Sequence, residues 1–322
     1  MIPQTRVSGD TASQGAAEAV LPASPAADPA RPAPRAAAGA RRGAVADLRQ
    51  IVRELVQSRD LLVQLTLRDI RIRYKQAVLG FAWALVLPVV VVLAGFAVRL
   101  AIAYTAGRPI DNLQFAGMAI KAVPWAFFVG CIGSATPTLT ANTALVTKVY
   151  FPREVLPLAT MLAQSFDSAI GLAVVTLVMA VIGVGVSAQL LWAPVVLALL
   201  WIFTAAAALF LSCANLFFRD VKYMVQVGLS FGIFFTPVLV DVAMFGPKWG
   251  PRVMLNPIAP LLEGLRLSVV EHHNLLQPLR APAGYMVWHP WQLGYSAAWA
   301  LGGLVLAALV FHRAERRFAE LV

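Results

Sequence analysis

The sequence is short of charge, of cysteine and of the motifs that carry common chemistry. Only 13% of its 322 residues are charged, against roughly 25% in soluble proteins. Cys131 and Cys213 lie in apolar runs without a neighbouring histidine or second cysteine, which argues against a disulfide framework and favours small buried side chains. There is no G-x-x-x-x-G-K-[ST] loop and no H-E-x-x-H motif. The sequence therefore predicts no nucleotide-binding loop, no catalytic residue, no metal site and no cofactor in this chain.

Apolar residues are in excess and are gathered into long runs. Hydrophobic residues make up 59% of the chain, against roughly 45–50% in soluble proteins. Residues 77–98 contain no charge, and as a helix they extend about 33 Å, enough to cross a hydrocarbon core of about 30 Å. The sequence therefore predicts an all-α integral membrane protein.

Six transmembrane helices are predicted from these runs. The uncharged residues 168–218 are too long for one crossing, and Gly183 and Gly185 supply a turn between two spans. Residues 246–289 form neither a plain loop nor a full crossing, and the apolar spacing within 257–270 predicts a short re-entrant or interfacial helix. The expected spans are 77–104, 115–139, 155–185, 190–214, 223–240 and 291–312.

The first 76 residues differ from the rest of the chain. Residues 1–46 contain fifteen Ala and six Pro with few large apolar side chains, which predicts a disordered tail. Residues 47–76 repeat Leu and Ile at helical spacing with Arg on other faces. This pattern predicts an amphipathic helix along the cytoplasmic lipid interface, and the alternative is a solvated helix that packs on another subunit.

Basic residues are concentrated at the start of the chain. The net charge is +10, and twelve of the 26 basic residues precede Gln76, which favours a cytoplasmic flank near anionic lipid over nucleic-acid binding. Basic residues also occur in the short connections 148–153 and 219–222 and after residue 312. With six spans, both termini are then expected in the cytoplasm.

Three Asp, Lys or Arg residues lie within the predicted spans. Asp167 is either a proton relay or a structural group that pairs with Ser165, Ser168 or a basic side chain, and we favour the structural reading. Arg99 and Lys121, near the outer ends of the first two spans, are expected to extend to lipid headgroups.

Aromatic residues are frequent on the first two spans. A planar ring can stack on the apolar face of a sugar, and such rings also form the interfacial belt of most membrane proteins. Both interpretations apply to Trp83, Tyr104, Trp125, Phe127 and Phe128.

Seven strings occur in order along the chain. They are LRDIRIRYKQAVLG (67–80), LVTKVYFPREVLP (145–157), FRDVKY (218–223), TPV (236–238), LNPI (255–258), EGLR (263–266) and FHRAERRFAE (311–320). Together and in this order they resemble the ABC-2 type permeases that export polysaccharides such as O-antigen, capsule or teichoic acid. The resemblance covers residues 47–322 and would make residues 77–322 a six-span ABC-2 transmembrane domain.

The resemblance implies an inner-membrane homodimer whose interface forms the path of a polyprenyl- or lipid-linked glycan. Two copies of a separate subunit would bind ATP and Mg. The connection between spans two and three would contact that ATPase through Lys148, Tyr150, Phe151, Pro152, Arg153 and Glu154. The helix 47–76 would act as a gate that receives the lipid carrier's pyrophosphate through Arg68, Arg71, Arg73 or Lys75.

Two other functional classes fit the composition. One is a secondary transporter or channel that works without an ATPase, with Asp167 as its proton site. The other is a membrane-bound enzyme that modifies glycans, which would turn over substrate without a partner.

Overall fold

The computed structural model describes residues 44–75, 82–106, 112–148 and 151–321. Almost all of the predicted tail lies outside these residues, and the helical prediction agrees with most of the remainder. Two short strands that were not predicted, β1 (Leu279–Arg280) and β2 (Met286–Trp288), pair in an antiparallel hairpin. The α-helices are α1 (Ala44–Gln57), α2 (Arg59–Tyr74), α3 (Trp83–Ala106), α4 (Asn112–Ala135), α5 (Thr138–Ala141), α6 (Thr143–Lys148), α7 (Val155–Ile182), α8 (Trp192–Phe217), α9 (Val221–Gly232), α10 (Gly246–Val253), α11 (Ala259–Val269) and α12 (Pro290–Leu321).

Four helical segments of the described chain are long and apolar enough to cross a membrane. They are Leu113–Ala135, Val155–Ile182, Ala188–Phe217 and Pro290–Glu315, the third of which joins the 3-10 turn η3 (Ala188–Leu191) to α8. The other two predicted spans contain the shorter apolar helices Val89–Thr105 and Val221–Phe235. The last of these, α9 with the 3-10 turn η4 (Ile233–Phe235), reaches about 22 Å, less than the hydrocarbon core. At Thr236 the backbone becomes extended.

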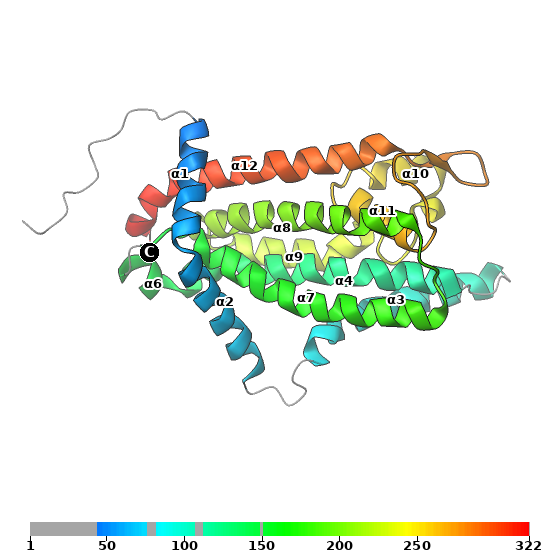
Figure 1. Ribbon diagram of the computed structural model, residues 1–322, viewed down its shortest axis with the longest axis horizontal. Coiled ribbons are helices and arrows are strands. Elements are labelled where there is room, and N and C mark those ends of the chain that lie inside the picture. Colours follow the sequence, from blue (N-terminus) through cyan, green and yellow to red (C-terminus); the bar gives the residue numbers. More distant parts are fainter. Residues whose placement is uncertain (1–43, 76–81, 107–111, 149–150, 322) are drawn as a thin grey trace, which may run out of the picture. The chain divides into compact units, whose positions relative to one another are not determined.

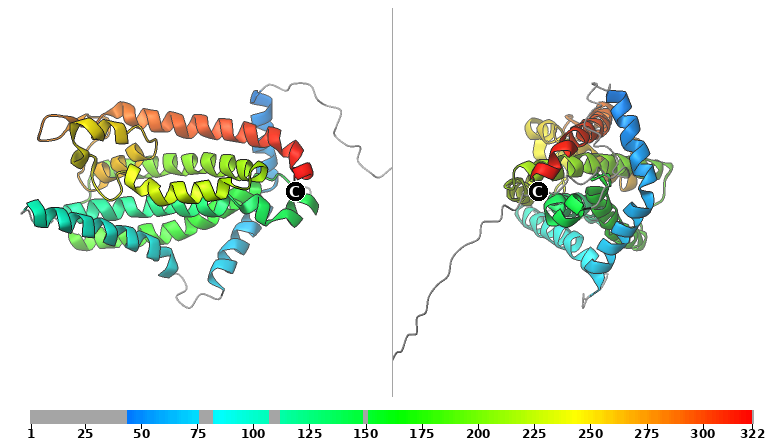
Figure 2. Two further views of the ribbon diagram at one scale, coloured as in Figure 1. Left: turned by 180° about the vertical axis from the view of Figure 1, so that it is seen from behind. Right: turned by 90° about the vertical axis from the view of Figure 1, so that its left-hand side faces the viewer.

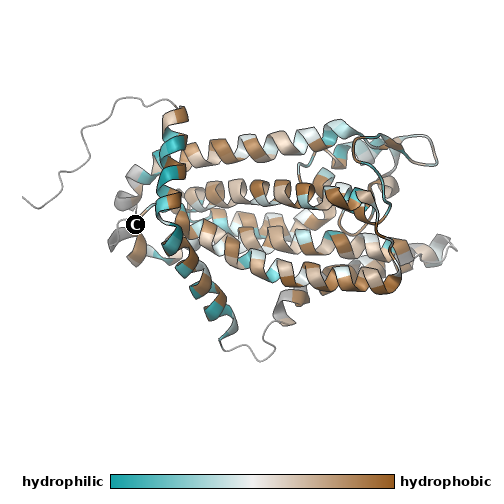
Figure 3. Cartoon of the chain, viewed as in Figure 1, coloured by the Kyte–Doolittle hydropathy of each residue, from teal (hydrophilic) through white to brown (hydrophobic). Residues whose placement is uncertain are grey.

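Helix α4 is the central helix, and α3, α7, α8 and α11 all pack against it (Figures 1 and 2). Its apolar window is 78% buried, against 22% for the windows of α7 and α12. Figure 3 shows that apolar residues predominate along these helices. Some of them are exposed, for example Leu177 and Leu306. Such faces suit lipid tails or a partner helix. Cys131 and Cys213 are free and buried, as predicted.

The predicted helix 47–76 is two helices, α1 and α2, separated at Ser58, where the backbone leaves the helical region (φ −98°, ψ 15°). Helix α1 contacts α12, and α2 contacts α7 (Figure 1). Ile51 and Leu65 are buried against the chain's own helices, whereas Val52 and Val63 are exposed. Only part of the apolar surface is therefore free to meet lipid, because the rest packs within this chain.

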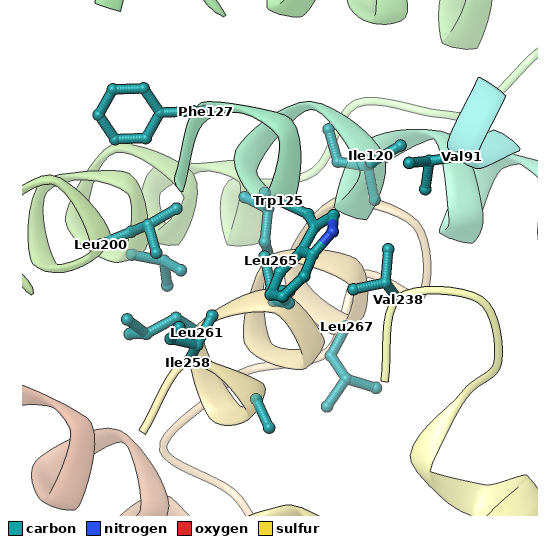
Figure 4. Close-up of a cluster of buried hydrophobic side chains, with 14 of the residues drawn as sticks. Val91, Ile120, Trp125, Phe127, Leu200, Val238, Ile258, Leu261, Leu265 and Leu267 are labelled. Carbon is teal, nitrogen blue, oxygen red and sulfur yellow. The ribbon is translucent and has the colours of Figure 1, made fainter. Parts of the chain in front are cut away.

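The segment between η4 and α12 forms a compact insertion rather than a surface loop. The 3-10 turn η5 (Val242–Phe245), α10, α11 and the hairpin β1–β2 follow one another, and every residue from Ala259 to Ser268 is buried. Figure 4 shows Leu261 and Leu265 of α11 beside Trp125 of α4 and Val238. The predicted short helix is confirmed, and it is enclosed by protein.

Candidate functional site

A groove of about 730 Å³ lies between α3, α4 and α9. Its walls are mainly aliphatic, with polar groups from Thr136, Gln226 and Ser230 and a basic group, Lys222, at the start of α9. Such a surface forms an apolar groove with a few hydrogen-bonding groups along it and a positive charge where α9 begins. The lining residues are Val90, Val91, Ala94, Trp125, Val129, Gly133, Thr136, Pro137, Lys222, Tyr223, Val225, Gln226, Leu229, Ser230 and Ile233.

Among the predicted aromatic residues whose side chains are described, Trp125 lines this groove. A Cβ on Gly232 would lie 3.1 Å from the Trp125 ring, so the glycine allows α9 to approach the indole closely. Phe128 lies beside Trp125 with ring centroids 5.9 Å apart, and Phe127 is buried in the core. Tyr104 is 91% exposed at the end of α3. The side chain of Trp83, where α3 begins, lies outside the described part of the chain.

One side of α9 and one side of α3 expose large apolar residues beside the groove. Exposed fractions on the α9 side, including η4, range from 58% to 72%. Two of these residues, Val90 and Tyr223, also line the groove, so a second apolar surface placed against α3 and α9 would cover part of its border. The exposed residues are Tyr223, Met224, Val227, Phe231, Phe234 and Phe235 on α9 and η4, and Val89, Val90, Leu93, Phe96 and Leu100 on α3.

The connection between α6 and α7 is held against the last helix. Arg153 donates hydrogen bonds to the carbonyl oxygens of Glu315 (2.8 Å) and Val146 (3.2 Å), and its guanidinium lies 5.7 Å from the centre of the Phe318 ring. The side chain of Glu154 is buried. These two predicted contact residues therefore make internal contacts in this structure.

Phe151 and Pro152 are partly exposed, so they remain available to a partner surface. Tyr150 and the side chain of Lys148 lie outside the described residues.

The basic residues predicted to bind a pyrophosphate differ in their surroundings. Arg71 and Lys75 are exposed on α2, whereas Arg68 forms an ion pair of 2.9 Å with its neighbour Asp69. Arg73 pairs with Asp167 of α7 and donates to the Gln164 side chain at 3.0 Å. Arg71 and Lys75 are thus the predicted residues best placed to meet an anionic group.

Asp167 pairs with a basic side chain, which was one of the predicted alternatives. Besides Arg73, the hydroxyl of Tyr74 donates a hydrogen bond to it, and burial together with this bond raises the pKa of Tyr74 above its ordinary value. Ser165 and Ser168 instead donate to carbonyl oxygens of their own helix.

The prediction that Lys121 extends to lipid headgroups is wrong. Its side chain is fully buried, and its ammonium lies 3.0 Å from Asp241 Oδ1, 3.6 Å from Glu263 Oε2 and 3.2 Å from the Val240 carbonyl oxygen. The extended backbone after η4 has carbonyls that no helix satisfies, and a buried donor stabilises them. Arg266 completes the cluster with a bond of 2.6 Å to Glu263. The side chain of Arg99 lies outside the described residues.

The family model for ABC-2 type transporters matches residues 60–270, about two thirds of the chain and the same region that carries the groove, the connection and the buried cluster. The chain belongs to the ABC-2 type transporter family. The resemblance seen in the sequence strings is confirmed, and the chain is a multi-pass membrane subunit of that family.

Relatives of this ABC-2 chain include permeases named for O-antigen export. It is 28% identical over 241 residues to the O-antigen export system permease protein RfbA of Myxococcus xanthus, covering 74% of this chain and 91% of the relative. It is 27% identical over 208 residues to the protein of the same name from Klebsiella pneumoniae, covering 63% and 77%.

One short pattern in this ABC-2 chain escaped the sequence reasoning. Residues 228–232 read Gly-Leu-Ser-Phe-Gly, which matches the letters of the hydrolase motif G-x-S-x-G. That motif needs a sharp turn from strand to helix, whereas these residues lie within α9 and the Ser230 hydroxyl donates to the Gln226 carbonyl at 2.9 Å. Ser230 is therefore a groove-lining hydroxyl with no nucleophile geometry.

Proposed function

We propose that this chain is the membrane subunit of an ATP-driven exporter of lipid-linked polysaccharide. Two copies, each with six spans, enclose the path, and each binds one separate ATP-binding cassette subunit that supplies ATP and Mg. The names of the relatives support a glycan substrate, and the family supports an ATPase partner. The substrate is a long polymer, so the path must be continuous through the dimer.

The observation that carries the proposal is the groove with its exposed apolar borders on α3 and α9. A single chain leaves this groove open on one side. A second copy placed against α3 and α9 would bury the exposed side chains and enclose the space between two Trp125 walls. Aromatic and aliphatic walls tolerate many sugar identities because ring stacking needs no specific hydroxyl pattern.

The positions of the basic residues support an orientation with both termini in the cytoplasm. Figure 1 shows α1, α6 and the C-terminal end of α12 at the same end of the bundle. Arg153 lies in the connection after α6, and Arg313 lies in the last part of α12. Cytoplasmic ends carry the excess of Lys and Arg in membrane proteins. The same end presents Phe151 and Pro152, the rigid and apolar part of the connection that we assign to ATPase contact.

Reconstitution tests the proposal directly. Proteoliposomes that contain this chain and its ATPase should translocate a lipid-linked O-antigen polymer only when ATP is hydrolysed. The readout is protection of the glycan from an added glycosidase. Translocation at the same rate with an ATPase that binds but does not hydrolyse ATP would contradict the proposed coupling.

Disulfide cross-linking tests the dimer. In a cysteine-free background, Val227→Cys on the exposed side of α9 should form a cross-linked dimer on mild oxidation in membranes. Leu177→Cys on the outer side of α7, which is similarly exposed, serves as the matched control and should stay monomeric. Equal cross-linking at both positions would indicate random collision and would contradict an interface on α9.

A further inference from the structure

Three potential metal ligands from two helices converge where α7 begins. Glu154 is the residue directly before α7, and His312 and Glu315 are one turn apart near the cytoplasmic end of α12. One ligand atom from each of the three residues lies within 4.8 Å of the others. Glu154 is separated from the other two residues by more than 150 residues in sequence, so only the fold brings the three together.

The carboxylate of Glu154 is buried without a hydrogen-bond partner among the described residues. Glu154 is 2% exposed, and neither of its oxygens has a hydrogen-bond partner. The Nδ1 atom of His312 also lacks one, and it lies 3.9 Å from Glu154 Oε1, too far for a hydrogen bond. A buried carboxylate in this condition is costly unless a cation completes it.

The nearby guanidinium groups are engaged elsewhere. Arg153 directs its guanidinium to the carbonyl oxygens of Glu315 and Val146. Its backbone N–H donates to Glu315 Oε1 at 3.4 Å, and its Nη1 atom lies 4.0 Å from the same carboxylate oxygen. Arg313 faces Asp47 of α1 at 3.7 Å. Neither arginine therefore donates a hydrogen bond into the space between Glu154 Oε1 and His312 Nδ1, which lie 3.9 Å apart.

We propose that Glu154, His312 and Glu315 bind one divalent transition-metal ion. One imidazole nitrogen and two carboxylates are a donor set typical of Zn²⁺, which keeps a fourth position for water. In a tetrahedral site, bonds of about 2.1 Å place ligand atoms roughly 3.4 Å apart. The three groups, whose ligand atoms lie within 4.8 Å of one another, therefore approach by up to about 1.4 Å when the ion binds. The ion neutralises both carboxylates and joins the start of α7 to the end of α12.

This site goes beyond the proposed transport function, because its first effect is on metal content and stability. A bound ion would fix the Phe151–Pro152 segment relative to α12 and stabilise the fold through linkage. Its presence can be measured without substrate, ATP or partner.

The experiment uses the full chain with a tag that contains no histidine, purified in detergent and stripped with EDTA. His272 and His273 are first replaced by Asn to remove an adjacent surface pair. Zn²⁺ is the probe; bound metal is measured by mass spectrometry and the melting temperature by fluorescence. We expect about one Zn²⁺ per chain and a melting temperature several degrees higher with the ion.

Glu154→Gln and His312→Asn should weaken zinc binding at least about 100-fold and abolish the thermal shift. His289→Asn, at the other end of α12, is the matched control and should change neither readout. Glu154→Gln keeps the shape of the side chain and removes a buried charge that has no hydrogen bond. Without metal this variant should therefore melt no lower than the parent, and a loss of zinc binding cannot be attributed to misfolding. Absence of stoichiometric zinc in the parent, or full binding by Glu154→Gln, would overturn the proposal.

Discussion

The ammonium of Lys121 on α4 lies 3.0 Å from the carboxylate of Asp241 in the extended segment after α9. Lys121→Met keeps the length of the side chain and leaves Asp241 and Glu263 without one of their cations. The Lys121 side chain is fully buried and that of Asp241 is 14% exposed. Breaking this buried pair should lower the free energy of unfolding by about 3–5 kcal/mol. Thermal unfolding in lipid nanodiscs measures the loss.

Lys248→Met is the control for this change, because Lys248 is exposed in α10. It should shift the unfolding free energy by less than about 0.5 kcal/mol. Equal stability of Lys121→Met and the parent protein would show that the buried cluster contributes little.

Substitutions in the ion pair between Arg73 and Asp167 can distinguish a structural role of Asp167 from a role as a proton relay. Asp167→Asn should cost about 1–3 kcal/mol, less than a fully buried pair because the Arg73 side chain is 33% exposed. The charge-swapped double variant Arg73→Asp with Asp167→Arg should recover part of that loss and support ATP-dependent glycan transport. If transport instead disappears in Asp167→Asn while stability is unchanged, Asp167 acts as a proton site.

The surroundings of Tyr74 predict that its contribution to folding stability depends on pH. Its pKa is raised above 10.0 in the folded protein by burial and by its bond to Asp167, so the folded state retains the phenol proton more strongly than the unfolded chain does. The resulting contribution to stability is constant below about pH 10 and is lost as the pH rises further. The stability difference between the parent and Tyr74→Phe, measured from pH 7 to 11, should therefore shrink only above pH 10.

Gly264 and Gly302 predict opposite effects of the same substitution. A Cβ on Gly264 would meet Trp288 at 3.2 Å, and Trp288 is held in place because its indole donates to the Leu275 carbonyl. Gly264→Ala should therefore destabilise by about 1–3 kcal/mol. A Cβ on Gly302 meets nothing within 4 Å, so Gly302→Ala should be neutral or stabilise by up to about 1 kcal/mol. Urea titrations of the two variants in mild detergent test whether their changes in the free energy of unfolding differ in sign.

Gly133 offers a way to narrow the groove without disturbing packing. It lines the groove, and a Cβ there meets nothing within 4 Å. Gly133→Leu should lower glycan translocation at least several-fold while the melting temperature stays within a few degrees of the parent. Gly302→Leu adds the same side chain on α12 outside the groove and should transport normally; a normal rate for Gly133→Leu would place the substrate path elsewhere.

The long apolar helices and the short helix α11 were predictable because the sequence patterns that indicate them are local. Hydropathy over about twenty residues identified the spans, and the spacing of Leu261 and Leu265 behind Pro260 identified α11. The length of α9 was overestimated because the apolar pattern continues through residues 236–240 after the helix has ended. Hydropathy alone does not distinguish a helix from buried extended backbone.

The pairings of ionisable groups were not predictable, because they join segments far apart in sequence. Lys121 pairs with Asp241 and Glu263, which are more than 100 residues away in sequence. When such partners are unknown, a lysine near the end of a span is expected to contact lipid headgroups. Glu154 likewise appeared as a surface residue of a charged connection. The break at Ser58 is not marked in the sequence by a Pro or a Gly. It separates two helices with different partners, because α1 packs against α12 and α2 packs against α7.

The packing of α1 against α12 has a consequence for how the chain is made. Helix α1 leaves the ribosome long before α12, so it has no docking surface until the last apolar helix has been inserted. During that interval its buried positions, such as Ile51, have to be held by membrane lipid or by a chaperone. A nascent chain truncated before α12 should therefore expose α1 to protease, and completion of α12 should protect it.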